Sequence, residues 1–299
     1  MKYLFYACSG EGIVRYVCQL IGKYIDEPYA APIETLLDDL SVIAFSDSAE
    51  ELWGTLHFGR QVIPPAKIAE ENFDKIFICS AMSYETIKKN LTDQYGVAAD
   101  KIDCTAVKQS NYIRKQFVQY FAKRAEASGI EGNVAEGGVY RGAFAKVINK
   151  CFSNRTLHLF DTFEGFSPND IVNDKKLAKS VNKHSHLGET CVEIVLNSLP
   201  YREKAIIHKG IFPETTKNVD DIFVFVSLDF DLYSPIKSGL EWFYPRMNRN
   251  GLILVHDYFN TNFDCMKAVD EFCEYYGLMP IPIGDGLSVA IICTSQVLP

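Results

Sequence analysis

The run Phe223-Val-Phe-Val-Ser-Leu-Asp229-Phe-Asp231 constrains the fold more than any other feature, because a large apolar segment ends abruptly in two carboxylates. A continuous apolar, β-branched run of this length predicts a strand that is buried on both faces, as at the centre of a parallel sheet. In open α/β sheets, ligands bind outside the carboxyl ends of the strands. The sequence therefore predicts an α/β fold with an acidic ligand site at one sheet edge.

A second apolar run, residues 251–255, also ends in ionisable groups, His256 and Asp257. Residues 237–247, between the two runs, have a helical pattern, so we expect the two strands to be parallel neighbours. The ionisable groups at both strand ends would then converge on one small volume. Carboxylates this close repel one another, so we expect a cation or a shared proton among them.

Composition restricts the kinds of partner. The chain has 299 residues, 47% of them hydrophobic and 23% charged, which is typical of a globular protein of one or two domains. A net charge of -8 and a pI near 5.3 argue against binding to nucleic acid or to an anionic membrane. We therefore expect a small-molecule or carbohydrate acceptor, with homo-oligomerisation left open.

Cysteine content and the lack of long apolar runs indicate the compartment. The nine cysteines contain no CxxC pair, which favours buried thiols in a reducing cytoplasm over a disulfide framework or a zinc site. No apolar run approaches the ~20 residues of a membrane span. We expect a cytoplasmic protein without a membrane partner.

Residues 1–104 are predicted to form a small Rossmann-like domain. A strand is followed by a glycine turn at residues 9–12 and by a helix, but the third glycine of a dinucleotide fingerprint is missing near Tyr16. Asp47, after the next predicted strand, suits either a ribose contact or a turn. The domain is thus either nucleotide-binding or a degenerate scaffold.

Residues 105–299 are predicted to form a second domain, which opens with an amphipathic helix over 111–127 that Gly129 ends. The next strand reaches Glu136 and then a loop with three glycines, Gly137, Gly138 and Gly142. Such glycines allow a ligand to approach the backbone, and the following helix offers free N–H groups. An acid at the start of this loop suits a ligand with an amine, such as the methionine end of S-adenosylmethionine; a tight turn without a ligand is the alternative.

Asp161 follows the next strand, 25 residues beyond Glu136, where an acid commonly hydrogen-bonds ribose hydroxyls. At this point the chain resembles a known family. The runs AEGGVYRGAFA, LFDTFEGF, GIFPET, LDFDLYSP and HDY, in this order, resemble the macrocin O-methyltransferase family of metal-dependent sugar methyltransferases that use S-adenosylmethionine. The resemblance covers residues 110–299 and leaves the first domain outside.

The resemblance implies a class I, Rossmann-like methyltransferase domain that moves a methyl group from S-adenosylmethionine to a sugar hydroxyl, on a deoxysugar, a nucleotide sugar or a glycan. It also implies the cofactor-binding residues: Glu136, Gly137, Gly138, Tyr140, Arg141, Gly142, Asp161, Thr162, Phe163, Gly210, Ile211, Phe212 and Asp229. Ile211 and Phe212 could pack on the adenine ring or equally into the core.

Transfer of a methyl group to an alcohol needs the oxygen deprotonated, and a bound metal supplies that acidity. By resemblance, Asp229, His256 and Asp257 hold a divalent metal, first of all Mg²⁺, and Asp229 or Asp231 accepts the proton. The family usually has an aspartate at the position of His256, so manganese, iron, zinc or an empty site stay open. Alternatively, His256 only orients Asp257, and Asp231 only caps a helix.

Two other functions are compatible with these residues: a catechol-type O-methyltransferase, and a non-catalytic protein that binds S-adenosylmethionine. The polar stretch 167–189, which includes His184 and His186, is predicted to be either a lid over the site or a solvated loop. Residues 279–293 are predicted to form a closing antiparallel hairpin around Gly284-Asp285-Gly286.

Overall fold

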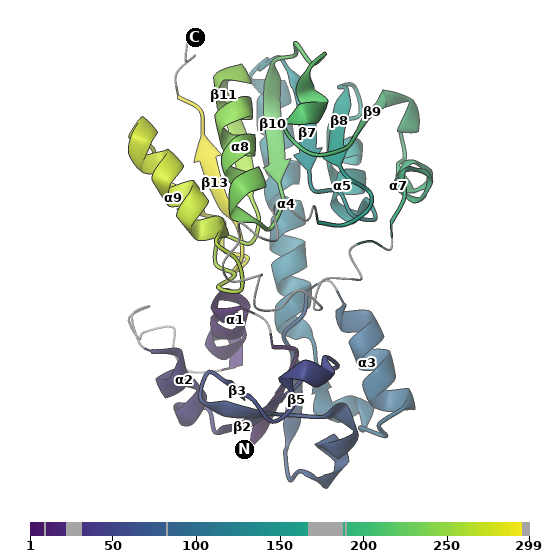
Figure 1. Cartoon of the computed structure of the whole chain (residues 1–299), viewed down its shortest axis with the longest axis vertical. Coiled ribbons are helices and arrows are strands. Elements are labelled where there is room, and N and C mark those ends of the chain that lie inside the picture. The colour runs from purple at the N-terminus through teal and green to yellow at the C-terminus, as the bar shows by residue number, and fades with distance from the viewer. Residues whose placement is uncertain (9, 22–31, 82, 167–187, 189, 295–299) are drawn as a thin grey trace. The chain divides into compact units, whose positions relative to one another are not determined.

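The computed structural model describes residues 1–8, 10–21, 32–81, 83–166, 188 and 190–294. The chain divides into two compact units, Met1–Ile113 and Arg114–Pro299, each with its own sheet (Figure 1). The division falls inside helix α4 (Thr105–Ala127). The boundary expected after residue 104 coincides with the start of that helix, which begins six residues before the predicted residue 111.

The first unit contains a six-stranded sheet in the order β3-β4-β2-β1-β5-β6. Its pairs are parallel except for the short antiparallel pair β3 and β4. The strands are β1 (Tyr3–Tyr6), β2 (Val42–Ser46), β3 (Leu56–His57), β4 (Arg60–Ile63), β5 (Lys75–Ile78) and β6 (Ile102–Asp103). The helices before α4 are α1 (Glu11–Ile21), α2 (Ile33–Asp39) and α3 (Tyr84–Asp93). The α/β fold predicted for this part of the chain is confirmed.

Asp47, directly after β2, accepts hydrogen bonds from two backbone amides. Its Oδ2 accepts the amide of Cys8, 2.7 Å away, in the loop that follows β1, and its Oδ1 accepts the amide of Ala49 at 2.9 Å. Of the two roles that the sequence allowed, the structure shows the turn.

The second unit contains a seven-stranded sheet in the order β12-β13-β11-β10-β7-β8-β9. The five strands from β11 to β9 are parallel, and β13 lies antiparallel between β11 and β12. The strands are β7 (Asn133–Gly137), β8 (Leu157–Asp161), β9 (Ala205–Lys209), β10 (Phe223–Leu228), β11 (Met247–Val255), β12 (Ile281–Pro282) and β13 (Val289–Ile292). Every residue of β10 is buried, as predicted for a central strand.

Helices cover both faces of this sheet (Figure 1). One core layer joins the sheet to α4, α5 (Ala143–Cys151) and α7 (Val192–Ser198), and the other joins it to α8 (Tyr233–Phe243) and α9 (Cys265–Tyr276). Helix α8 begins before Pro235, because proline is tolerated in a first turn, where its missing N–H would have no intrahelical partner. The predicted start at residue 237 was therefore too late.

The predicted closing hairpin is confirmed. Asp285 organises its turn, because its Oδ1 accepts the amides of Leu287 and Ser288 at 3.0 and 2.7 Å and its Oδ2 accepts the hydroxyl of Ser288 at 2.6 Å. Strand β13, which follows this turn, pairs with β11 on the side opposite to β10.

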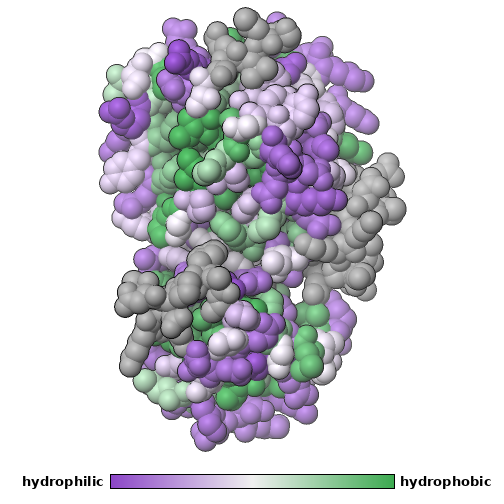
Figure 2. Space-filling model, turned by 90° about the vertical axis from the view of Figure 1, so that its left-hand side faces the viewer, coloured by the Kyte–Doolittle hydropathy of each residue, from purple (hydrophilic) through white to green (hydrophobic). Residues whose placement is uncertain are grey.

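Polar and apolar residues are interspersed on the face shown in Figure 2. Among the helices described, none combines the length and the apolarity needed to cross a bilayer. Six of the nine cysteines are buried, as expected, whereas Cys8 and Cys151 are partly exposed and Cys191 is exposed. The predicted lid, residues 167–189, with His184 and His186, lies outside the described residues except for residue 188.

Candidate active site

The carboxyl ends of four neighbouring strands meet at one edge of the second sheet. Leu228, the last residue of β10, is in register with Val255 of β11 and with Gly137 of β7, and Gly137 is in register with Phe160 of β8. The residues one position beyond these register partners therefore stand at the same level: Gly138, Asp161, Asp229 and His256. The structure brings together the groups that the sequence placed at one sheet edge.

Each of these strands is followed by a non-glycine residue with left-handed backbone. These residues are Tyr140 (φ 50°), Phe163 (φ 55°), Asp231 (φ 62°) and Asp257 (φ 56°). This conformation costs roughly 1–2 kcal/mol for a residue with a Cβ, and such residues cluster at binding and catalytic sites. Their concentration at one edge supports a functional site there.

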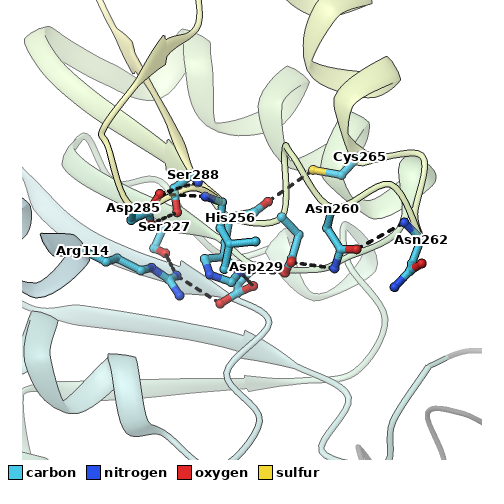
Figure 3. A network of polar contacts seen from close by, with 11 residues as sticks. Arg114, Ser227, Asp229, His256, Asn260, Asn262, Cys265, Asp285 and Ser288 are labelled. Atoms are coloured by element: carbon cyan, nitrogen blue, oxygen red, sulfur yellow. Dashed lines mark hydrogen bonds and ion pairs between the residues drawn. The ribbon is translucent and has the colours of Figure 1, made fainter. Parts of the chain in front are cut away.

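The acidic centre consists of Asp229, His256 and Asp257. Asp229 and His256 are labelled in Figure 3. Nδ1 of His256 lies 3.1 Å from Oδ1 of Asp229 and 2.6 Å from Oδ2 of Asp257. Asn260 donates from Nδ2 to Oδ1 of Asp257 at 2.9 Å. One ligand atom from each of the three residues lies within 4.8 Å of the other two, which is close enough for all three to bind one ion.

Arg114 of α4 contacts the acidic centre, and this contact was not predicted from the sequence. Its Nη2 donates to Oδ2 of Asp229 at 3.0 Å and to the hydroxyl of Ser227 at 3.4 Å, as Figure 3 shows. Its guanidinium lies 3.7 Å from the centre of the Phe144 ring. A signal existed: Arg114 is spaced by four residues from the buried Val118, so it lies on the apolar face of the helix.

The charges of the centre depend on one another. Burial by itself would raise the pKa of Asp229, but His256 and Arg114 outweigh burial and hold that pKa well below its usual value. Burial and Arg114 would lower the pKa of His256, but Asp229 and Asp257 outweigh them and raise it to about 10. Burial would also raise the pKa of Asp257, and His256 keeps it low instead. Two carboxylates thus face two cations.

Two further carboxyls near the centre have raised pKa values. Burial, followed by the charge of Asp229, raises the pKa of Glu136 well above its usual value. Burial, followed by the charges of Asp257 and Asp229, does the same to the pKa of Asp231. The environment of both acids therefore favours their protonated form over the ionised one.

The donor set of the centre fits a divalent ion. It offers carboxylate oxygens and one imidazole nitrogen, and each carboxylate oxygen that accepts a hydrogen bond keeps a second lone pair. Mg²⁺ prefers oxygen alone, whereas manganese, iron and zinc also accept imidazole. To bind an ion, His256 must offer Nδ1 as a lone pair rather than as a donor.

Asp161 organises the glycine loop after β7. Its Oδ2 accepts the amides of Val139 and Tyr140 at 2.6 and 2.9 Å, and its Oδ1 accepts the amide of Phe163 at 2.6 Å. A carboxylate has about four acceptor positions, so one remains for a ribose hydroxyl. The ribose role stays a prediction, and the structure adds a structural role to it.

The glycines of the loop are needed by the protein itself. A Cβ on Gly137 would lie 2.3 Å from the ring of Phe230, and one on Gly138 would lie 2.1 Å from the carbonyl oxygen of Asp229. A Cβ on Gly142 would lie 3.0 Å from Val195. The room that we expected these glycines to leave for a ligand is therefore filled by neighbouring chain on the side where a Cβ would project.

The other expected cofactor residues lie around the same edge. Thr162 donates from its hydroxyl to the carbonyl of Gly165 at 2.6 Å, and Arg141 is exposed. Ile211 is 42% exposed, whereas Phe212 is 8% exposed and packs between the rings of Phe160 and Phe243. Of the two placements that the sequence allowed for Phe212, the structure shows the core.

Comparison with known families gives two matches. Residues 72–286 match the macrocin-O-methyltransferase (TylF) family, and residues 22–103 match the family described as C2185-like, N-terminal. The first match begins in the first unit, so the expected start of the resemblance at residue 110 was wrong. All the motifs that carried it lie beyond residue 134, so they gave no information on the preceding segment.

Individual relatives agree with this match. The chain is 25% identical over 185 residues to the 8-demethyl-8-(2,3-dimethoxy-alpha-L-rhamnosyl)-tetracenomycin-C 4'-O-methyltransferase of Streptomyces olivaceus, over 58% of this chain and 70% of that protein. It is 26% identical over 175 residues to the mycinamicin III 3''-O-methyltransferase of Micromonospora griseorubida, over 54% of this chain and 68% of that protein.

The fold of a solved structure agrees as well. The O-methyltransferase NovP superposes with a TM-score of 0.53 at 21% identity, over 61% of this chain and 80% of that chain. The second unit accordingly has the class I methyltransferase fold, as expected. The family match spans more than half of the sequence, and the chain therefore belongs to the macrocin O-methyltransferase family of enzymes that use S-adenosylmethionine.

Proposed function

We propose that this enzyme transfers the methyl group of S-adenosylmethionine to a sugar hydroxyl, with a divalent metal held by Asp229, His256 and Asp257. One observation carries the proposal: the acidic centre stands at the ends of β10 and β11, next to the glycine loop after β7. Relatives named for methylation at a rhamnosyl group and on mycinamicin III support a glycosidic acceptor.

The reaction is an in-line displacement. A lone pair of the acceptor oxygen attacks the methyl carbon, the carbon–sulfur bond breaks, and its electron pair stays on sulfur, which leaves as the neutral thioether of S-adenosylhomocysteine. The hydroxyl loses its proton. A divalent ion, when bound at the acidic centre, supplies the Lewis acidity that makes this proton easier to remove.

The residues of the centre orient the acceptor and receive its proton. Asp229 and Asp231 are the two acids at the end of β10, and Asp229 is the ionised one of the pair. Arg114 and His256 fix both oxygens of Asp229 in place. In this arrangement Asp229 is our candidate to accept the hydroxyl proton, because the raised pKa of Asp231 favours the form that already carries a proton.

The test is a methyl-transfer assay with radiolabelled S-adenosylmethionine on three acceptor sets: nucleotide sugars, deoxysugar glycosides and catechols. We expect transfer to a sugar acceptor, loss of transfer with EDTA, and recovery with added Mn²⁺, Zn²⁺ or Mg²⁺. Transfer only to catechols would support the catechol-type enzyme instead. Binding of S-adenosylhomocysteine without transfer to any acceptor would support the non-catalytic protein.

A further inference from the structure

An arginine and a glutamate of the second unit each leave one buried atom without a hydrogen-bond partner among the described residues. These atoms are Nε of Arg114 and Oε2 of Glu136. Arg114 is 9% exposed and Glu136 is 1% exposed, so bulk solvent provides few hydrogen bonds to either side chain. A buried polar atom without a partner costs the free energy of its lost hydration, and this cost is larger for groups that can carry a charge. Such a pair indicates a missing ligand.

Both atoms lie on one face of the sheet. Glu136 of β7 is in register with Ser227 of β10, and residues in register on parallel neighbours project to the same face. Arg114 reaches the hydroxyl of that serine at 3.4 Å, which places its guanidinium over this face. Among the described ion pairs, Arg114 pairs with Asp229 and not with Glu136. The two groups thus share a face without satisfying each other.

The pair also brackets the glycine loop. Glu136 stands directly before Gly137, and Phe144, on which the guanidinium of Arg114 lies, is in the first turn of α5 directly after the loop. A ligand held by both groups would therefore lie against this loop. The ligand must present an anion and a cation close together, and an α-amino acid carries both on one carbon.

We infer that Arg114 binds the α-carboxylate of S-adenosylmethionine through Nε while Glu136 binds its α-ammonium. An amine at Glu136 was expected from the sequence, whereas no partner for the carboxylate was. The inference rests on the use of S-adenosylmethionine by this enzyme. It gives Arg114 two tasks, because Nη2 holds Asp229 while Nε holds the ligand.

Three ligands distinguish the contribution of the α-carboxylate from that of the α-ammonium. Calorimetry measures their binding without any turnover. S-Adenosylmethionine has both groups, decarboxylated S-adenosylmethionine has only the ammonium, and 5'-methylthioadenosine has neither. Arg114→Met should weaken S-adenosylmethionine by roughly ten- to hundred-fold and leave the other two ligands within about two-fold of wild type. Glu136→Gln should weaken both amine-bearing ligands and leave 5'-methylthioadenosine unchanged.

Matched variants make the result decisive. Lys115→Met removes the same charge from an exposed position on the same helix and should change none of the three affinities. Should Arg114→Met fail to fold, Arg114→Lys keeps a charge for Asp229 but lacks the Nε donor, so it should still weaken S-adenosylmethionine selectively.

Equal weakening of all three ligands by the Arg114 variants would overturn the inference and leave Arg114 as a support for Asp229, with water as the partner of Nε. Wild-type protein that bound none of the three ligands would overturn the assigned use of S-adenosylmethionine itself.

Discussion

Nδ1 of His256 lies 2.6 Å from Oδ2 of Asp257. The same nitrogen lies 3.1 Å from Asp229, so one imidazole nitrogen stands between two carboxylates at the point where a metal would bind them. As a donor, Nδ1 satisfies both carboxylates and competes with a cation; as a lone pair, it is a ligand for that cation. In the proposed metal site, the preference among divalent ions would therefore depend on His256.

The first prediction concerns His256→Asp. This variant removes the competing cation and supplies a third carboxylate, the donor that Mg²⁺ prefers. We expect Mg²⁺ to bind at least ~10-fold more tightly, which corresponds to about 1.4 kcal/mol, while Zn²⁺ loses affinity with the imidazole. Titration calorimetry with each ion measures both effects. Unchanged Mg²⁺ affinity would mean that the three residues do not form a metal site.

The second prediction concerns Asp229→Asn. The amide keeps the shape of the side chain but removes the charge that pairs with Arg114 and His256. We expect methyl transfer to fall by about 10²–10⁴-fold, the range for loss of a group that handles the proton. Retention of more than a tenth of wild-type turnover would exclude the proposed role.

Asp231→Asn is the matched control for that variant. The raised pKa of Asp231 favours its neutral carboxyl, which an amide imitates, and asparagine tolerates the left-handed backbone of this position. It should therefore be the milder change, measured in the same assay. A larger loss at residue 231 than at residue 229 would reassign the proton acceptor to Asp231.

The third prediction concerns Asp161→Ala. This variant removes the acceptor of three backbone amides, so the melting temperature should fall. If the remaining acceptor position binds ribose, loss of these charge-assisted bonds should also weaken 5'-methylthioadenosine and S-adenosylmethionine equally, by roughly ten- to hundred-fold. This pattern differs from the one expected for Arg114. A lower melting temperature with unchanged affinities would restrict Asp161 to the structural role.

The fourth prediction concerns acid stability and a histidine pair remote from the acidic centre. Nδ1 of His158 lies 3.0 Å from Nε2 of His208. Burial lowers the pKa of His158, and burial followed by the charge of His158 lowers the pKa of His208 to about 4. The unfolded chain takes up these protons near pH 6.5.

The stability that comes from keeping both rings neutral is therefore complete above pH 6.5 and is lost as the pH falls from 6.5 towards 4. The slope is at most about 1.4 kcal/mol per pH unit for each histidine, and less where solvent screens His208. Thermal unfolding between pH 7.5 and 4.5 measures it. His208→Gln should flatten the profile, and an unchanged slope in that variant would contradict this explanation.

Much of the fold could be predicted from strand patterns, because a long apolar run is informative by itself. The exceptions depended on geometry that the local sequence does not encode. The hairpin of β3 and β4 turns at Phe58 and Gly59, with φ values of 46° and 73°. A phenylalanine in this conformation is unusual, and the Asn-Gly or Asp-Gly signal of such turns is absent.

The acidic centre could be predicted because its members end two neighbouring strands. Arg114 could not, because it meets Asp229 across 115 residues of sequence and comes from a helix rather than from a strand end. The contacts of Asp161 with three backbone amides could not be predicted either, since backbone amides leave no mark in a sequence. Contacts between side chains and partners far away in the sequence are thus the ones that could not be predicted.

Helix α4 continues without a break across the boundary between the two units, and Arg114 is the first residue of the second unit. A chain truncated to start at that residue would place Arg114 at a frayed terminus, because the first turn of a helix lacks its upstream carbonyl partners. An excised methyltransferase unit would thus keep its sheet and lose the arginine that orders Asp229. A shortened chain that lacks the amino-terminal unit should therefore start no later than Thr105, so that Arg114 stays inside a complete helix.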